Sequence, residues 1–257
     1  MQVNLAKFRK HYFLKRHTPR LLFAVAFLAI SLSACGDIRT AADCLISGNQ
    51  YFAAKDYEHA AAEYREALKR EPKSSTALNN LGVVLNELGK YDEAAEVLSK
   101  ALEQDPKNII AQYAIARSLT HLKKYDEAIT HARIAVELAP DELAAHRALA
   151  DAGLASGQID AALDEYRYIA RSDPDNDEAH QKLGEALLKK GDNDAAAAEL
   201  ERALQLRSDN SDARKAYAEV LSNKGNKDAA VAEIDTLLKG APNDSELKDL
   251  RSSYLAK

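Results

Sequence analysis

The stretch STALNNLGVVLNELGKYDEAAEVLSKALEQDPKN, residues 75–108, sets the fold of the chain. Its apolar residues recur at intervals of three and four in two segments, which is the spacing of two amphipathic helices. Gly89 lies between the segments and Pro106 follows the second one. Glycine favours a turn and proline cannot continue a helix, so the stretch predicts two helices joined by a turn.

The same unit recurs along most of the chain. Alignment on the Leu-Gly pair of LNNLG gives starts 34 residues apart for units 1 to 6, at Ala41, Ser75, Ile109, Leu143, Asp177 and Ser211. Within a unit, position 20 is always alanine, position 8 is glycine or alanine, and position 32 is proline in all but the fifth unit. Small residues let the two helices of a unit approach closely, and stacking buries the faces that one helix pair leaves open.

This pattern resembles the tetratricopeptide repeat over residues 41–244. The resemblance implies an all-α, right-handed α-solenoid of six helix-turn-helix repeats. Residues 245–257 begin a further first helix with an apolar stripe at Leu247, Leu250 and Tyr254, and we expect this helix to cap the solenoid. The aromatic residue usual at position 4 in this family is missing; that position holds Cys44, Leu78, Gln112, His146, His180 and Arg214.

The resemblance also implies a binding surface, because stacked first helices line the inner, concave side of such solenoids. We expect positions 2, 5, 9 and 12 to face that side, since each lies about 100° around the helix from a buried position. The expected lining is apolar with asparagines in the first units and mostly acidic in the last ones, which suits a peptide with an apolar and a basic segment. The candidate groove residues are Asn49, Phe52, Asn79, Val83, Asn86, Tyr113, Arg117, Arg147, Asp151, Gln181 and Glu185.

The first 34 residues differ from the rest of the chain. They contain six basic residues and no acidic one, and they end in a 14-residue apolar run, Leu21–Ala34. This run is shorter than the roughly 20 residues that span a membrane, and together with the basic head it indicates a secretory signal peptide over residues 1–34.

The segment Leu32-Ser33-Ala34-Cys35 resembles the lipobox of bacterial lipoproteins. This resemblance implies cleavage before Cys35 and a lipid on its thiol, with residues 35–40 as a short tether. Gly36 rather than aspartate follows the cysteine, which in enteric-type bacteria resembles outer-membrane sorting. We therefore expect a lipid-anchored protein of the bacterial envelope, at the outer membrane and facing the periplasm. An ordinary signal peptide, or an uncleaved anchor, is the alternative.

Charge and motifs exclude several classes of function. Without the six basic residues of the leader, 29 basic residues face 40 acidic ones, a net charge of −11, which disfavours nucleic acid as a partner. The histidines lack metal-ligand spacing, and neither a nucleophile elbow nor a phosphate-binding glycine loop is present. We expect no cofactor, no metal and no enzymatic activity. Cys44 would be the only free thiol after lipidation, and we expect it to be a small buried residue, with pairing between two chains as the alternative.

Together these features predict a membrane-anchored scaffold that binds an envelope protein or peptide. The layout loosely resembles that of repeat-containing lipoproteins of Tad and type IV pilus systems, which suggests an assembly factor for a pilus or secretion machine. Two alternatives are a scaffold for cell-wall or exopolysaccharide machinery and a dimeric structural lipoprotein.

Overall fold

The computed structural model describes residues 39–256. The predicted signal peptide, Cys35 and residues 35–38 of the predicted tether lie outside the described residues. Within that range the chain forms 13 α-helices and no strand. None of these helices is both long and apolar enough to cross a membrane.

The helices follow one another in pairs. The first helices are α2 (Ala41–Ala53), α4 (Ser75–Glu87), α6 (Ile109–His121), α8 (Leu143–Ser156), α10 (Asp177–Lys190) and α12 (Ser211–Asn223). The second helices are α3 (Tyr57–Arg70), α5 (Tyr91–Gln104), α7 (Tyr125–Leu138), α9 (Ile159–Ser172), α11 (Asn193–Leu206) and α13 (Lys227–Gly240), and α14 (Ser245–Ala256) follows them. Every first helix begins at a predicted unit start, so the predicted helix-turn-helix periodicity is confirmed.

Each turn between the two helices of a pair requires one residue in the left-handed conformation. Position 15 supplies it, and four of the six residues at this position are glycines. Lys55 (φ 59°) and Lys123 (φ 61°) adopt the same conformation without being glycine. A side chain makes this conformation unfavourable, so these two turns carry strain that the glycine turns lack.

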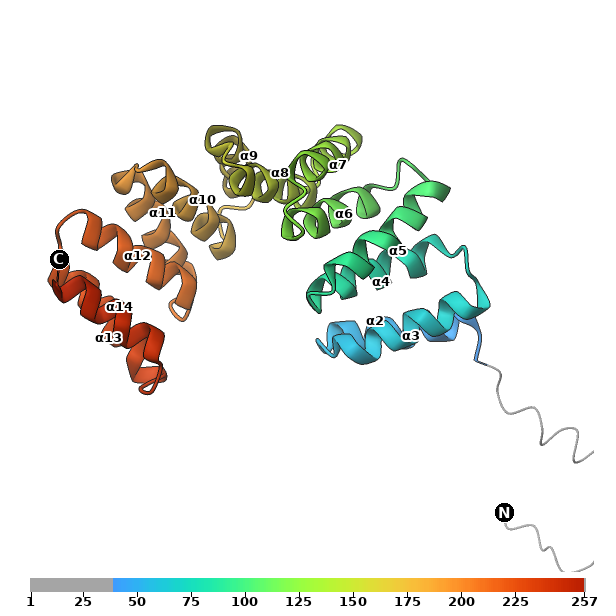
Figure 1. Cartoon of the computed structure of the whole chain (residues 1–257), viewed down its shortest axis with the longest axis horizontal. Coiled ribbons are helices and arrows are strands. Elements are labelled where there is room, and N and C mark those ends of the chain that lie inside the picture. Colours follow the sequence, from blue (N-terminus) through green and yellow to red (C-terminus); the bar gives the residue numbers. More distant parts are fainter. Residues whose placement is uncertain (1–38, 257) are drawn as a thin grey trace, which may run out of the picture. The chain divides into compact units, whose positions relative to one another are not determined.

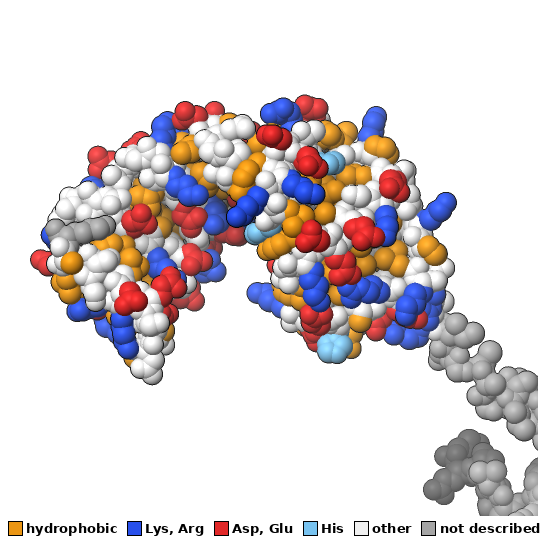
Figure 2. All heavy atoms as spheres, viewed as in Figure 1, with side chains coloured by type: hydrophobic (Ala, Val, Ile, Leu, Met, Phe, Trp, Pro, Cys, Tyr) orange, Lys and Arg blue, Asp and Glu red, His pale blue; other side chains and the backbone are white. Residues whose placement is uncertain are grey.

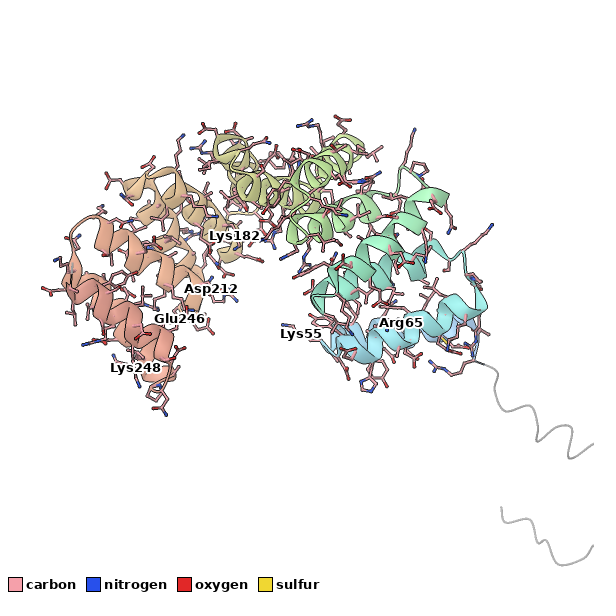
Figure 3. The ribbon with its side chains drawn as sticks, viewed as in Figure 1. Lys55, Arg65, Lys182, Asp212, Glu246 and Lys248 are labelled. Atoms are coloured by element: carbon pink, nitrogen blue, oxygen red, sulfur yellow. The ribbon has the colours of Figure 1, made fainter. Side chains whose placement is uncertain are left out.

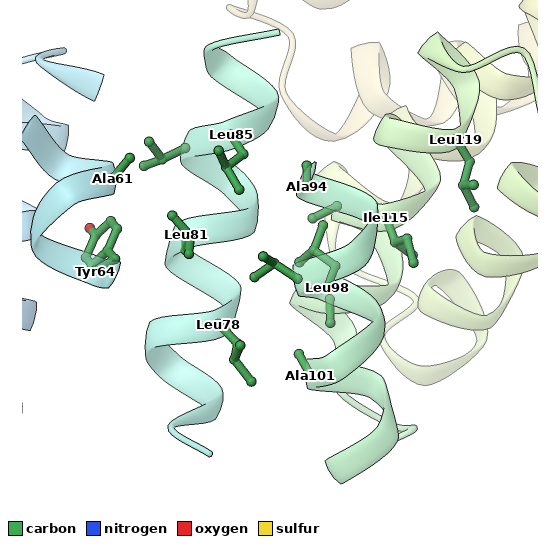
Figure 4. Packing of buried hydrophobic residues seen from close by; sticks show 14 of the residues in the cluster. Ala61, Tyr64, Leu78, Leu81, Leu85, Ala94, Leu98, Ala101, Ile115 and Leu119 are labelled. Carbon is green, nitrogen blue, oxygen red and sulfur yellow. The ribbon is translucent and has the colours of Figure 1, made fainter. Parts of the chain in front are cut away.

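Small residues at position 8 allow the two helices of a pair to pack closely. A Cβ atom on Gly82 would lie 2.4 Å from Leu98 Cγ, and one on Gly184 would lie 2.6 Å from Leu200 Cγ. Leu98 is fully buried in a cluster with Leu81, Leu85 and other apolar side chains of the first units (Figure 4). Glycine at this position is therefore required wherever a branched side chain comes so close.

Contacts between successive units place the first helices on one side. The backbones of α4 and α6, of α6 and α8, and of α10 and α12 are in close contact, whereas no two successive second helices among residues 39–256 are in comparable contact. The pairs α2–α4 and α8–α10 also lack it. The helices of this part of the chain therefore follow an arc with α7 and α9 on its outer side (Figure 1).

Alanine at position 3 is a second feature of the contact between units. It is almost fully buried in units 2 to 6, at Ala77, Ala111, Ala145, Ala179 and Ala213. In unit 1 this position holds the exposed Asp43, because no helix pair precedes α2 among the described helices. Burial at position 3 was not predicted from the sequence.

The C-terminal end is covered by α14. Leu247 and Tyr254, which the sequence analysis placed on the apolar stripe of this helix, are 4% and 3% exposed. They form a cluster with Val231 and Ile234 of α13. The opposite side of α14 exposes polar residues such as Lys248 and Ser252, so the helix closes the apolar core.

Candidate functional site

The candidate site is the inner row of first helices, α2 to α12. Of the eleven predicted groove residues, eight have exposed or partly exposed side chains: Asn49, Phe52, Val83, Tyr113, Arg117, Arg147, Asp151 and Glu185. The other three, Asn79, Asn86 and Gln181, are buried. The predicted row is therefore partly an open surface and partly a contact between units.

Asn86 belongs to the contact between units. Its side chain is 2% exposed. Its Nδ2 donates a hydrogen bond to Ala114 O at 2.8 Å, and its Oδ1 accepts one from Ser118 Oγ at 2.7 Å. Asn86 thus joins α4 to α6 and offers no free group to a ligand.

Side chains at position 5 also form hydrogen bonds between units. Asn79 Nδ2 donates to Asn108 Oδ1 at 3.1 Å, and Gln181 Oε1 accepts from Asn210 Nδ2 at 2.8 Å. Asn108 and Asn210 are the N-caps of α6 and α12. A side chain that caps one first helix therefore also holds the preceding first helix, which fixes the spacing of the inner row.

The arginines of the row form ion pairs at the surface. Arg117 Nη1 lies 2.5 Å from Glu87 Oε1. Arg147 Nη1 lies 2.8 Å from Glu178 Oε1. These side chains are between 29% and 48% exposed. Such exposed pairs contribute about 0–1 kcal/mol, so a ligand can replace either partner at little cost.

Position 9 joins the two helices of a pair. Tyr64 donates its hydroxyl hydrogen to Asn49 Oδ1 at 2.7 Å, and Tyr166 donates to Asp151 Oδ1 at 2.5 Å. Burial, followed by the charge of Asp151, raises the pKa of Tyr166 far above its usual range. These bonds orient Asn49 and Asp151 on the inner surface.

The open part of the row changes in character along the array. Near its beginning, Phe52 and Ile110 are 38% and 43% exposed. Near its end, Asp212, Glu219 and Glu246 are exposed and take part in none of the salt bridges of residues 39–256. Lys182, Asp212 and Glu246 lie along the inner side of the C-terminal helices (Figure 3), where the space-filling view shows acidic and basic side chains together (Figure 2). The exposed side chains of the row are thus partly apolar near its beginning and of both charges near its end.

A network at position 4 was missed by the sequence analysis. In units 3 to 6, the side chain at this position binds the backbone carbonyl of position 32 in the preceding unit and a side chain at position 23 of its own unit. The carbonyl partners lie 2.8, 2.8, 3.1 and 2.6 Å from Gln112, His146, His180 and Arg214. The side-chain partners are His131, Glu165, Glu199 and Glu233, at 2.7, 2.6, 2.7 and 2.5 Å. The signal in the sequence is the matched pair of polar residues at positions 4 and 23 of units 3 to 6.

The described residues contain little that suggests chemistry. No group of three or more His, Cys, Asp or Glu side chains within residues 39–256 is placed to hold a metal ion. Cys44 is a free thiol with no exposed surface, as predicted for a small core residue. Pairing of this thiol with a second chain would require α2 to separate from its neighbours.

Comparisons with known proteins agree on the type of repeat. Models of the tetratricopeptide repeat match residues 47–109, 85–152, 153–202 and 187–254. No curated protein sequence matches the chain.

Several solved structures are similar to this one. TTC0263, a tetratricopeptide repeat protein of Thermus thermophilus, is 28% identical, with a TM-score of 0.61 over 72% of this chain and 100% of that chain. The pilF protein of Pseudomonas aeruginosa is 20% identical, with a TM-score of 0.67 over 83% and 97% of the two chains. YrrB, described as having an unusual peptide-binding site, is 23% identical, with a TM-score of 0.52 over 72% and 95%. The last two similarities concern the fold alone.

Proposed function

The chain belongs to the tetratricopeptide repeat family, whose members act as protein-interaction scaffolds, and we propose that it binds a protein or peptide of the bacterial envelope along its inner row of first helices. In this proposal the protein holds its partner without catalysing a reaction. The ligand is an extended segment with apolar residues at one end and basic residues at the other.

The distribution of open side chains along the row supports this proposal. Phe52 and Ile110 expose apolar surface in the first units, where an apolar side chain of a ligand gains from burial. Asp212 and Glu246 are exposed in the last part, outside the salt bridges that the described residues form. A basic segment would pair with them, and would be attracted to this end over a distance of about 8–10 Å at physiological salt.

We further propose that Cys35 carries a lipid that anchors the protein to the outer membrane, with the repeats in the periplasm. The proposal rests on the lipobox-like sequence before Cys35 and on the short tether. Six extended residues reach only about 20 Å, so the first unit would lie close to the membrane surface. Intact-mass spectrometry of the purified protein should show the added lipid, and its absence from a Cys35→Ala variant should coincide with release from membranes.

An assembly role for a pilus or secretion machine is the more specific form of this proposal. The similarity in fold to pilF of Pseudomonas aeruginosa supports it, together with the lipobox-like leader.

Photo-crosslinking in cells tests the binding surface. A photoreactive residue at the exposed position of Ile110 should yield one discrete partner, and the same residue at Ser99, exposed on α5, should not. Charge reversal of Asp212 and Glu246 to lysine should remove the crosslinked product. Matched reversals of Glu103 and Glu137, which are both exposed on second helices, should leave it unchanged. Crosslinks from Ser99 alone would show that the outer side binds the partner and that the inner row does not.

A further inference from the structure

A pocket of about 200 Å³ lies between units 4 and 5, on the side formed by second helices. It is lined by Arg167, Ala170, Arg171, His180, Leu183 and Glu199. The first three belong to α9, the next two to α10 and the last to α11. None of them is among the residues of the inner row.

One residue of the pocket lining, Ala170, departs from the repeat pattern. Position 28 of a unit normally carries a branched apolar side chain that fills the groove toward the next unit. This position holds Leu68, Leu102, Val136, Leu204 and Leu238 in the other five units. The four leucines pack against the apolar clusters of their neighbours. In unit 4 the position holds Ala170, whose side chain has three carbon atoms fewer than that of leucine, and the groove beside it stays open.

The floor of the pocket is apolar and its rim is basic. Ala170 and Leu183 are 7% and 4% exposed. Arg167 and Arg171 lie one helical turn apart on α9, and both side chains are exposed. Glu199 is the acidic residue of the lining, and its carboxylate already binds His180 Nδ1 at 2.7 Å.

The two arginines have weak partners within the chain. Arg171 Nε donates to the backbone oxygen of Arg167 at 3.2 Å, and Arg171 is in none of the salt bridges of the described residues. Arg167 Nη1 lies 3.3 Å from Asp164 Oδ1, whose side chain is 78% exposed. By contrast, Arg65 on α3 binds Glu93 of the next unit at 2.5 Å. Two available guanidinium groups beside an apolar pocket are unusual in a body with a net charge of −11.

We propose that this pocket binds a leucine-like side chain flanked by carboxylates, presented by an acidic segment of a partner protein. The aliphatic side chain occupies the space that leucine fills at position 28 of other units. The carboxylates form bidentate hydrogen bonds with Arg167 and Arg171. The planar guanidinium group of arginine matches the two oxygens of a carboxylate better than the ammonium group of lysine does. Because the pocket is separate from the inner row, the protein can hold this partner and a ligand of the inner row together.

Fluorescence polarisation with the full chain and the labelled peptide Gly-Ser-Glu-Leu-Glu-Ser-Gly tests the proposal. We expect saturable binding, weaker by about tenfold or more when alanine replaces the leucine of the peptide, and no binding when lysines replace its glutamates. Absence of saturable binding of the original peptide to the wild-type protein would overturn the proposal.

Two variants of the protein locate the site. Ala170→Leu fills the pocket with the side chain that four other units carry, so it should weaken binding by about tenfold or more while the melting temperature stays equal or rises. Arg171→Glu should abolish binding. The matched control is Arg133→Glu, at the equivalent of Arg167 in unit 3, where Val136 occupies position 28, and it should bind as the wild type does. Unchanged binding by both Ala170→Leu and Arg171→Glu would show that the peptide binds elsewhere.

Discussion

Lys55 and Lys123 adopt the left-handed backbone conformation, which glycine adopts in the other four turns. Lys123 has φ 61°, and an L-residue in this region costs about 1–2 kcal/mol. Lys123→Gly should therefore raise the free energy of unfolding by about 0.5–1 kcal/mol, because the greater freedom of glycine in the unfolded chain offsets part of the gain. Urea denaturation followed by circular dichroism measures this change.

The neighbouring residue provides the control. Lys124 has φ −90°, where a side chain is favourable, so Lys124→Gly should lower the stability instead. Equal destabilisation by the two substitutions would mean that the turn carries no strain at Lys123.

Stability should fall as the solution becomes acidic, in part because of His131. Burial lowers the pKa of His131 below its ordinary value of 6.5, although the nearby Glu127 opposes the shift. Burial, together with Arg117, also lowers the pKa of His121. The unfolded chain then binds more protons than the folded one, so this contribution to stability is complete above about pH 6.5 and is lost as the pH falls toward the lowered values.

Thermal denaturation between pH 5 and 7.5 tests this assignment. His131→Gln keeps a side chain able to bond to Gln112, and it should reduce the pH dependence of the melting temperature on the acid side. A slope identical to that of the wild type would assign the acid sensitivity to other groups.

The candidate site could be predicted only in part at this scale. The spacing of positions 9 and 12 placed Phe52 and Arg117 on an exposed face, and both side chains are exposed. Asn86 shares that spacing but is buried, because its surroundings depend on how closely α6 approaches α4. The periodicity of the sequence predicts which residues share one face of a helix. It does not predict how closely the next helix approaches that face, because this distance depends on contacts between residues far apart in sequence.

At the scale of helices, the pairing of position 8 with position 24 sets the distance between the two helices of a unit. Gly82 faces Leu98, and Gly184 faces Leu200. In unit 3 the same positions hold Ala116 and Ala132, both fully buried. Both positions of unit 3 are thus small, whereas units 4 and 6 combine alanine at position 8 with Tyr166 and Ile234 at position 24.

Gly82→Ala should lower the free energy of unfolding by about 1–3 kcal/mol, because the new Cβ atom would lie 2.4 Å from Leu98 Cγ. Adding Leu98→Ala should recover part of this loss, since the double variant reproduces the Ala-Ala pair of unit 3. Chemical denaturation of the wild type, the two single variants and the double variant gives the interaction energy. Additive losses in the double variant would contradict the steric explanation.

The starts of the first helices were the most predictable feature. Six recurrences of one pattern located each of these starts to the residue, because an error at one unit is corrected by the other units. The position 4 network was not expected, since Gln112, His146, His180 and Arg214 look unrelated until the structure pairs each with position 23.

At the scale of the whole repeat array, stability depends on its closed end. Removal of residues 245–257 would expose Val231 and Ile234, which are buried beside Leu247 and Tyr254. Burial of a large apolar side chain is worth about 1.5–3 kcal/mol, so the truncated protein should start to melt at a lower temperature and aggregate more readily. Differential scanning calorimetry with light scattering measures both effects.

The control for the truncation keeps the buried face of α14 and changes its exposed side. Lys248→Ser with Ser252→Lys leaves Leu247 and Tyr254 in place, and melting should match that of the wild type. Equal losses in this variant and in the truncated protein would show that α14 acts through its surface and not through its apolar face.

The junction between units 4 and 5 affects how the array responds to a pulling force. There α8 and α10 are not in close backbone contact, so the packing of α9 against α10 and the apolar cluster that both helices share hold the two units together. This junction then resists bending less than the junctions α4–α6 and α6–α8, where the first helices also meet. Under a pulling force it would extend before those two junctions, and a partner bound beside Ala170 would stiffen it.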